Sequence, residues 1–286
     1  MAPNPTTQRQ PLKLLMLHGY TQSGPLFHAK SRALTKHIQK AFPLHDVSTS
    51  YPTAPLRLLP ADIPGYEPSE TSTETSSIEA YGWWRRSNTA NPPLYTGIEE
   101  GLTTVARTLS EEGPFDGVIG FSQGAALAAM VAALLEPGRE ASFEHFEKIT
   151  GEGGVAGMPF PESFGAGAGF QHPPLKFAVC YSGFRAPGAR YRGFFEEPAI
   201  RTPVLHVLGS LDAVVEEGRS RALIEACVGE PEKEGLVVWH PGGHFLPSQR
   251  PYLDAAVKFI REYVGPENSK KGKVEEVDVN DMDMPF

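Results

Sequence analysis

The chain has 286 residues, of which 40% are hydrophobic and 21% charged, a composition typical of a folded globular protein rather than a disordered one. Its formal net charge of −8 disfavours a protein that binds nucleic acid by neutralising phosphates. The sequence has no apolar run of about 18 residues, the length that a membrane-spanning helix needs, and its polar N-terminus lacks the apolar core of a secretory signal. We therefore expect a cytoplasmic protein whose two cysteines are free thiols.

Strand-like and helix-like segments alternate along the chain. Apolar runs predict strands at about residues 12–17, 44–51, 115–121, 176–182, 203–209 and 236–240. Apolar residues at helical spacing predict helices at about residues 25–41, 98–109, 123–135, 216–228 and 251–264. This alternation predicts an α/β protein with a mostly parallel sheet and helices on both faces.

Two irregular stretches interrupt the alternation. Residues 52–80 combine repeated prolines with a Ser/Thr/Glu cluster, which indicates a long loop. Residues 138–174 are rich in Gly and Pro, with one short helix expected at 143–149. The second stretch carries Phe160, Phe164 and Phe170 among its glycines, a pattern that suggests a lid over a binding site.

The sharpest chemical signal is Gly120-Phe121-Ser122-Gln123-Gly124, which matches G-x-S-x-G. It follows an apolar strand and opens an Ala-rich helix, the setting in which a strained turn exposes a nucleophilic serine above a sheet. The helix N-terminus offers free N–H groups to a developing oxyanion. The alternative is that Ser122 merely caps the helix.

A serine nucleophile needs a base and a carboxylate that orients the base. His244 lies in a glycine-bearing loop after the predicted last strand, and His240, at the end of that strand, is the competing candidate. Asp212 follows the strand predicted at 203–209, at the edge where open α/β sheets build their sites. The alternative for Asp212 is a turn or helix-capping role. Ser122, Asp212 and His244 occur in the chain order of α/β hydrolases.

The oxyanion hole needs two backbone donors. We predict the N–H groups of Gln123 and Tyr20, with Thr21 as the neighbouring candidate. His18, two residues before Tyr20, is expected to hold this loop in shape. No metal-ligand spacing occurs, so we expect neither a metal nor a cofactor.

Aromatic residues supply candidate walls for a substrate. Trp83, Trp84 and Phe184 could bind an acyl group, although Trp83 and Trp84, with Tyr81, could equally anchor the first insertion to the core. The stretch 185–198 could line the same cleft. Its basic residues are weaker signs of an anionic substrate feature and could form a solvated face: Arg185, Arg190 and Arg192.

Several short segments together resemble the eukaryotic family of serine hydrolases (FSH), which is well populated in fungi. The resemblance covers about residues 12–264, and it rests on Leu17-His18-Gly19-Tyr20, Gly120-Phe121-Ser122-Gln123-Gly124-Ala125, Gly209-Ser210-Leu211-Asp212, His240-Pro241-Gly242-Gly243-His244, Tyr51-Pro52-Thr53-Ala54-Pro55 and Tyr81-Gly82-Trp83-Trp84. It implies an α/β-hydrolase fold and carboxylesterase activity on acyl esters. In some members it implies thioester release of a polyketide from a carrier protein, and acyl-protein thioesterases are similar at greater distance.

Under this resemblance, residues 12–265 form one α/β-hydrolase domain with insertions at about 52–93 and 138–174 near the active site. Residues 1–11 are expected to be a flexible N-terminus and 266–286 a disordered acidic tail. The predicted function is hydrolysis of small-molecule acyl esters through Ser122, His244 and Asp212. The alternatives are a thioesterase that releases a polyketide or fatty acyl chain from an acyl-carrier protein, and a non-catalytic binding protein of the same fold.

Overall fold

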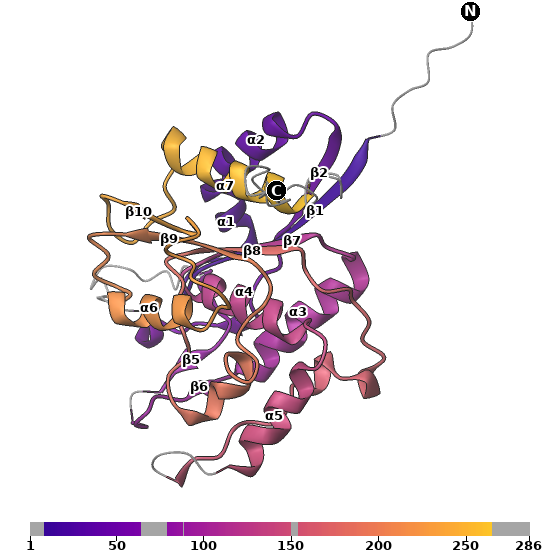
Figure 1. Cartoon of the computed structure of the whole chain (residues 1–286). Helices are drawn as coiled ribbons and strands as arrows, with labels where there is room; N and C mark the ends of the chain where they lie inside the picture. Colours follow the sequence, from indigo (N-terminus) through magenta and orange to yellow (C-terminus); the bar gives the residue numbers. More distant parts are fainter. Residues whose placement is uncertain (1–8, 64–78, 88, 150–153, 265–286) are drawn as a thin grey trace, which may run out of the picture.

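Six parallel strands form the central sheet of this protein, whose computed structural model describes residues 9–63, 79–87, 89–149 and 154–264. The strands lie in the order β10-β9-β8-β7-β1-β2 (Figure 1), and all six predicted strands are confirmed. Their bounds are β1 Gln10–Leu17, β2 His45–Ser50, β7 Gly117–Phe121, β8 Phe177–Tyr181, β9 Val204–Gly209 and β10 Val237–His240. The predicted acidic tail and most of the predicted flexible N-terminus lie outside the described residues.

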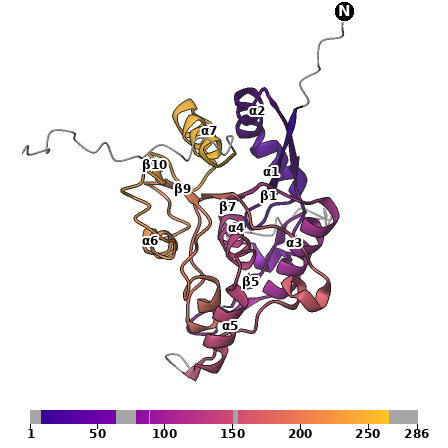
Figure 2. The ribbon, with the colours of Figure 1, turned by 45° about the vertical axis from the view of Figure 1, so that its right-hand side comes forward.

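Helices cover both faces of the sheet, as predicted (Figures 1 and 2). One face carries α1 Gly24–Lys30, α2 Arg32–Ala41 and α7 Arg250–Val264; the other carries α3 Ile98–Glu112, α4 Gln123–Leu134 and α6 Glu217–Glu225, with α5 Arg139–Lys148 farther from the sheet. Strand alternation divides the core between the two faces: Leu14 and Met16 pack with the first layer, Leu15 and Leu17 with the second. Every residue of α4 is buried, which is why its sequence is apolar all round.

The single helix predicted at 25–41 is wrong in one respect, because two helices meet at Ser31. The backbone there leaves the helical region, with φ −88° and ψ 3°. The Ser31 side chain is buried, and its hydroxyl forms a 2.8 Å hydrogen bond with the hydroxyl of Tyr51 beyond β2. The same hydroxyl is 3.4 Å from the His28 carbonyl of α1, and such side-chain bonds compete with helical geometry.

The first insertion, about residues 52–93, is tied to the body by short antiparallel pairs. In its described part, β3 Leu56–Arg57 pairs with β4 Tyr81–Gly82, and β5 Arg85–Arg86 pairs with β6 Tyr95–Thr96. Gln22 also forms an isolated bridge with Tyr81. These pairs bring the insertion against the loop that follows β1.

The lid expected from the second insertion is not observed among the described residues of 138–174. Phe164 is buried, and its ring lies 4.9 Å from that of Phe170. The ring of Phe160 meets that of Phe143 edge-on at 5.3 Å. His172 accepts a hydrogen bond from the Phe115 N–H just before β7 begins. These aromatic residues therefore pack with the core, and His172 lies where β7 starts rather than where it ends.

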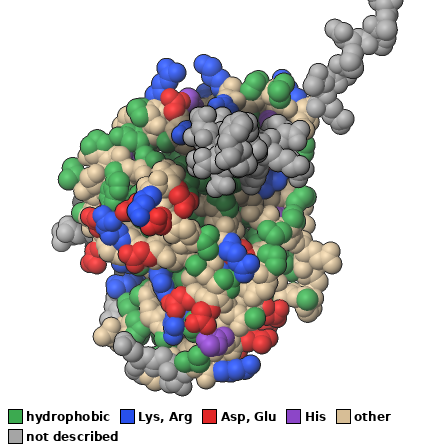
Figure 3. Space-filling view, viewed as in Figure 1, with side chains coloured by type: hydrophobic (Ala, Val, Ile, Leu, Met, Phe, Trp, Pro, Cys, Tyr) green, Lys and Arg blue, Asp and Glu red, His purple; other side chains and the backbone are tan. Residues whose placement is uncertain are grey.

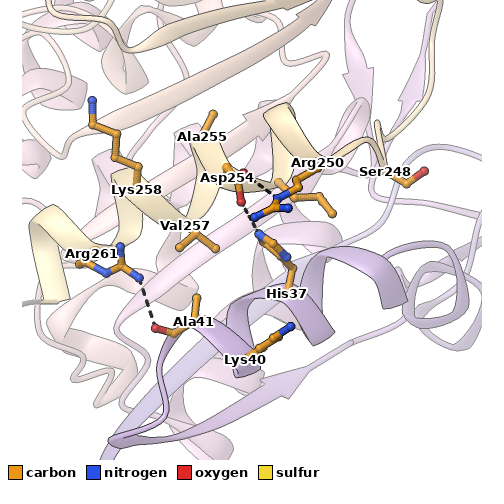
Figure 4. Close-up of a pocket in the computed structure, with 11 residues that line it drawn as sticks. His37, Lys40, Ala41, Ser248, Arg250, Asp254, Ala255, Val257, Lys258 and Arg261 are labelled. Atoms are coloured by element: carbon orange, nitrogen blue, oxygen red, sulfur yellow. Dashed lines mark hydrogen bonds and ion pairs between the residues drawn. The ribbon is translucent and has the colours of Figure 1, made fainter.

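A groove of about 840 Å³ runs between α2 and α7 (Figure 4). Asp254 lies between His37, whose Nε2 is 2.7 Å away, and Arg250, whose Nε is 3.4 Å away. Arg261 donates to the Ala41 carbonyl at the end of α2. These contacts join the two helices.

The visible surface mixes charges of both signs around α6 (Figure 3). Arg221 pairs with Glu217 and Glu232 there. Among the described helices, none is both long enough and apolar enough to cross a membrane.

Candidate active site

Ser122 lies at the sharp turn between β7 and α4. Its backbone has φ 54° and ψ −118°, a conformation that a residue with a side chain adopts only at a cost. The strand before it is fully buried, and the Ser122 N–H donates to the Tyr181 carbonyl at the end of β8. The turn is thus held rigidly at the edge where the strands end.

The two glycines of the motif are required by close packing. A Cβ at Gly120 would lie 2.2 Å from the Gly124 carbonyl oxygen, and a Cβ at Gly124 would lie 2.1 Å from the Leu17 carbonyl oxygen. Both positions have negative φ, so the demand is for space and not for conformation. The absence of these two side chains lets α4 approach β1 and β7 closely enough to close the turn.

The structure brings the three predicted residues of the triad together. His244 Nε2 lies 2.9 Å from Ser122 Oγ, and His244 Nδ1 lies 2.7 Å from Asp212 Oδ2. Asp212 follows β9 and His244 follows β10, so each side chain comes from the carboxyl end of a different strand. The two loops are linked by backbone hydrogen bonds, from Leu211 to Gly242 and from Ser210 to His240.

The carboxyl group of Asp212 is held in its ionised form. Burial alone would raise its pKa, but hydrogen bonds from the Val215 N–H, from His244 and from the Val214 N–H lower it below its usual value. Both backbone bonds to Oδ1 measure 2.9 Å. One oxygen is thus fixed by the backbone, and the other is left to accept the Nδ1–H of His244.

His240, the competing base, does not reach Ser122. Its ring packs against those of Phe245 and Tyr252, at 5.0 and 5.6 Å between centroids. Burial lowers its pKa, although the charge of Asp212 opposes this. Its Nδ1 accepts from the Gly242 N–H, so the ring shapes the loop that carries His244.

The predicted oxyanion donors lie on either side of Ser122 in the fold. Gln123 is the first residue of α4, and a first-turn N–H has no acceptor within its helix. The N–H of Thr21, the neighbouring candidate, is already used, since it donates to the Tyr81 carbonyl at 2.9 Å. Among the described residues, the Tyr20 N–H donates to no other group. The N–H groups of Tyr20 and Gln123 are thus without an acceptor among the described residues.

The side chain of Gln123 has a further role that the sequence did not reveal. Its Oε1 accepts from the Trp83 N–H and its Nε2 donates to the Trp84 carbonyl, both at 2.8 Å. These bonds clamp the first insertion onto the turn that holds Ser122. The partners lie about 40 residues away in the sequence, so no local pattern could have indicated the clamp.

We expect Gln123→Ala to lower the free energy of unfolding by about 2–4 kcal/mol, because it leaves a buried N–H and a buried carbonyl without partners. Urea unfolding measures the loss. Gln39→Ala, which truncates an exposed glutamine on α2, is the matched control and should change stability by less than about 0.5 kcal/mol. Equal stability losses for the two variants would contradict the clamp.

Ser122 and His244 open into a cleft of about 470 Å³. Its walls are mostly apolar, with polar groups near the first loop: Tyr20, Thr21, Gln22, Phe27, Lys30, Ile63, Phe121, Val214, Phe245 and Leu246. Such a combination is typical of a pocket for a small molecule with an apolar portion. Sequence reasoning named Tyr20 and Thr21 for their backbone groups and Phe121 as part of the serine motif, whereas the other wall positions belong to no motif.

The predicted substrate-binding residues Trp83, Trp84 and Phe184 do not line this cleft. Trp83 is fully buried, and its Nε1 donates to the His18 carbonyl at 2.9 Å. Trp84 stacks on Tyr95 with 4.8 Å between centroids. Phe184 is 7% exposed, beneath the guanidinium of Arg219. The anchoring alternative therefore describes the two tryptophans, because their polar groups are used in fastening the insertion to the core.

His18 shapes the loop that presents Tyr20, as expected. It is fully buried, its Nε2 accepts from the Ala54 N–H at 2.9 Å, and its Nδ1 donates to the Gly19 carbonyl at 2.8 Å. Burial lowers its pKa to about 4, although the bond to Gly19 opposes the shift. Protonation of Nε2 would break the bond to Ala54.

The folded protein should therefore lose stability in acid. Between the ordinary pKa of 6.5 and the folded value of about 4, the unfolded chain binds a proton at His18 that the folded chain does not, so the free energy of unfolding falls as the pH falls. His18→Gln retains an acceptor for Ala54 and does not titrate. From about pH 7 to about pH 5 it should lose about 2 kcal/mol less than the wild type in urea unfolding. Parallel losses in both proteins would contradict this assignment.

In the part of the chain that the structure describes, no cluster of His, Cys, Asp or Glu side chains could hold a metal ion. The two cysteines are buried, and burial raises the pKa of both thiols, that of Cys227 to about 12. Neither is therefore poised as a nucleophile.

Several known proteins are similar to this chain in sequence. The family described as serine hydrolase (FSH1) matches residues 7–256. Family of serine hydrolases 3 of Saccharomyces cerevisiae is 31% identical over 96% of this chain and 92% of its own length. Esterase OVCA2 of Danio rerio is 31% identical over 88% of this chain and 98% of its own length. A Schizosaccharomyces pombe protein named dihydrofolate reductase is 33% identical over 88% of this chain, which spans 47% of that protein.

Among solved structures, Zea mays acyl-protein thioesterase 2 superposes with a TM-score of 0.52 at 20% identity, over 92% of this chain and 97% of that one. At this identity the likeness concerns the fold alone.

Proposed function

Because the chain belongs to the serine hydrolase (FSH1) family and has the α/β-hydrolase fold, we propose that it is a carboxylesterase that cleaves acyl esters through Ser122, His244 and Asp212. The observation that carries the proposal is the unbroken hydrogen-bond chain from Asp212 through His244 to Ser122, at the mouth of a mostly apolar cleft. A nucleophile, a base and an orienting carboxylate in these positions are the parts that acyl transfer requires.

In the first half-reaction Ser122 Oγ attacks the ester carbonyl carbon while its proton passes to His244 Nε2. Asp212 stays ionised, keeps the proton of the free imidazole on Nδ1 and stabilises the imidazolium that forms. The N–H groups of Tyr20 and Gln123 bind the negative oxygen of the tetrahedral intermediate. When the intermediate collapses, the C–O bond to the leaving group breaks, and His244 donates its proton to the departing alcohol.

The second half-reaction returns the enzyme to its starting state. Water attacks the acyl-enzyme carbonyl while His244 Nε2 accepts a proton from the water. The same N–H groups hold the oxyanion, the bond to Ser122 Oγ breaks, and the serine recovers its proton from His244. The product is the free carboxylic acid. No step needs a metal or a cofactor.

The test is kcat/KM on matched oxygen esters and thioesters of increasing acyl length, with Ser122→Ala as the blank. We expect turnover of oxygen esters with an optimum in chain length, because a cleft of about 470 Å³ with apolar walls accepts a limited acyl group. Failure of the protein to hydrolyse either series or to react with a fluorophosphonate would overturn the proposal in favour of a non-catalytic binding protein.

A thioesterase is the second candidate, since the same nucleophile and oxyanion donors serve a thioester carbonyl. Weak activity on every oxygen ester, with thioesters clearly favoured, would indicate that the acyl chain arrives on a carrier protein. That result would change the leaving group and the partner but leave the proposed roles of Ser122, His244 and Asp212 in place.

A further inference from the structure

We infer that the cleft selects ester substrates that carry an anionic group, which Lys30 and Gln22 bind beside the apolar walls. This inference rests on the proposed function and names the substrate class of that site. It comes from an ammonium and an amide NH₂ that lie at one cleft and have no partner among the described residues.

Lys30 is the only Lys, Arg, Asp or Glu among the described residues that line the cleft. It is the last residue of α1, three positions after Phe27, so both side chains come from the same face of the helix. Phe27 is buried against the sheet, while Lys30 is exposed. Within the described part of the chain, Lys30 forms no ion pair and no hydrogen bond. Its charge is available to a molecule in the cleft.

Gln22 supplies the second donor. It lines the same cleft and is 6% exposed, and its backbone is fixed by the bridge to Tyr81. The buried Oε1 has no partner among the described residues, and the amide NH₂ donates to none of them either. The amide NH₂ is therefore free to donate to a ligand, whereas the buried Oε1 is an acceptor and would need a donor from elsewhere. An anionic oxygen accepts from both an ammonium and an amide NH₂.

The arginines that the sequence offered for an anionic substrate do not serve this role. Arg185 and Arg192 both pair with Glu196, whose pKa their hydrogen bonds and charges lower although burial opposes the shift. None of the three arginines, including Arg190, lines the cleft. Among the described residues that line the cleft, Lys30 is therefore the one lysine or arginine.

The remaining walls define the other half of the ligand. Phe27, Ile63, Val214, Phe245 and Leu246 are apolar, so an alkyl or aryl portion binds there while its charged end stays at Lys30. Because Lys30 is exposed, the pair with it is worth about 1 kcal/mol or less, equivalent to about fivefold in kcat/KM. We therefore expect Lys30 to change the preference for anionic over neutral esters and not the turnover of neutral esters.

Two substrate series test the inference on the full chain and tell the acyl side from the leaving-group side. The first contains 4-methylumbelliferyl esters of adipic, suberic and sebacic acid, each with its far carboxylate free or methyl-capped. The second contains octanoyl esters of 4-hydroxybenzoate and of its methyl ester. The readout is the ratio of kcat/KM for the anionic substrate to that for its capped partner.

We expect Lys30→Met to lower this ratio by about fivefold in one of the series, and Lys30→Glu to lower it by about fivefold more. Gln22→Met should lower it in the same series. Lys36→Met, which removes an exposed charge on α2 outside the cleft, is the matched control and should leave the ratio unchanged. Added salt should reduce the wild-type ratio and have no effect on the ratio of Lys30→Met.

Equal ratios for the wild type, Lys30→Met and Lys36→Met in both series would overturn the inference while leaving the esterase proposal standing. An equal fall of the kcat/KM ratio in Lys36→Met would show an effect of net charge alone, and that result would also overturn the inference. If the wild type cleaves neither the anionic nor the capped esters faster than Ser122→Ala, the proposed function itself is wrong.

Discussion

Replacement of Ser122 by alanine should reduce kcat for ester hydrolysis by about 10⁶-fold, leaving only what the oxyanion donors and substrate binding provide. The change removes the one atom that forms the acyl-enzyme and its bond to His244 Nε2, while His244 keeps its bond to Asp212. Alanine tolerates the φ of 54° no better than serine does, so the fold should be retained at about the same stability. Single-turnover assays and fluorophosphonate labelling measure the loss.

Ser182→Ala is a matched control for this prediction. Ser182 also ends a strand, also has positive φ, at 49°, and is 1% exposed. Its hydroxyl has no hydrogen-bond partner among the described residues. We expect full labelling of Ser182→Ala and none of Ser122→Ala. Labelling of Ser122→Ala at the wild-type rate would place the nucleophile elsewhere.

Asp212→Asn should reduce kcat by about 10⁴-fold with little change in KM. The carbonyl oxygen of the asparagine would keep the bonds from Val214 and Val215, so its NH₂ would face His244 Nδ1. That nitrogen would have to accept, and the proton of the imidazole would move to Nε2. With Nε2 protonated, His244 could no longer take the proton of Ser122. Steady-state kinetics at neutral pH measure the loss.

The chain contains a second Asp–His pair that serves as the control. Asp254 Oδ1 lies 2.7 Å from His37 Nε2, in the groove between α2 and α7 and away from the cleft. Asp254→Asn makes the same chemical change and should leave kcat within about twofold of the wild type. A kcat for Asp212→Asn within tenfold of the wild type would show that Asp212 does not orient the base.

Local patterns were enough to predict the strands of the sheet and the order of the candidate catalytic residues along the chain. The buried runs that became β7 and β8, and the Ala-rich run that became α4, are apolar because sheet and helix cover them, so their burial is visible in the residues themselves. The turn at Ser122 could be predicted for the same reason, since its demand for small neighbours is met by Gly120 and Gly124 within the same five residues.

Contacts between distant segments could not be predicted in this way. The break at Ser31 depends on a hydroxyl of Tyr51, and the burial of Trp83 depends on the carbonyl of His18 and the side chain of Gln123. An aromatic residue next to an insertion fits equally well as a substrate wall or as an anchor, because both roles favour the same side chain. The placement of Phe164 and Phe170 in the core rather than in a lid could not be predicted for the same reason, because aromatic side chains suit both roles.

The sequence by itself therefore determined the class of fold, the turn that presents Ser122 and the choice of Asp212 and His244 as its candidate partners, because each of these is encoded by a short run at the end of a strand. Only the tertiary structure decided which side chains form the cleft. Its walls come from the loop after β1, α1, the residue after η1 (Pro60–Asp62), the end of β7 and the loops after β9 and β10, and no one of these segments indicates the others. Gln22 and Ser122 line one cleft because the parallel sheet brings the ends of separate strands to a common edge, and Lys30 joins them from the end of α1.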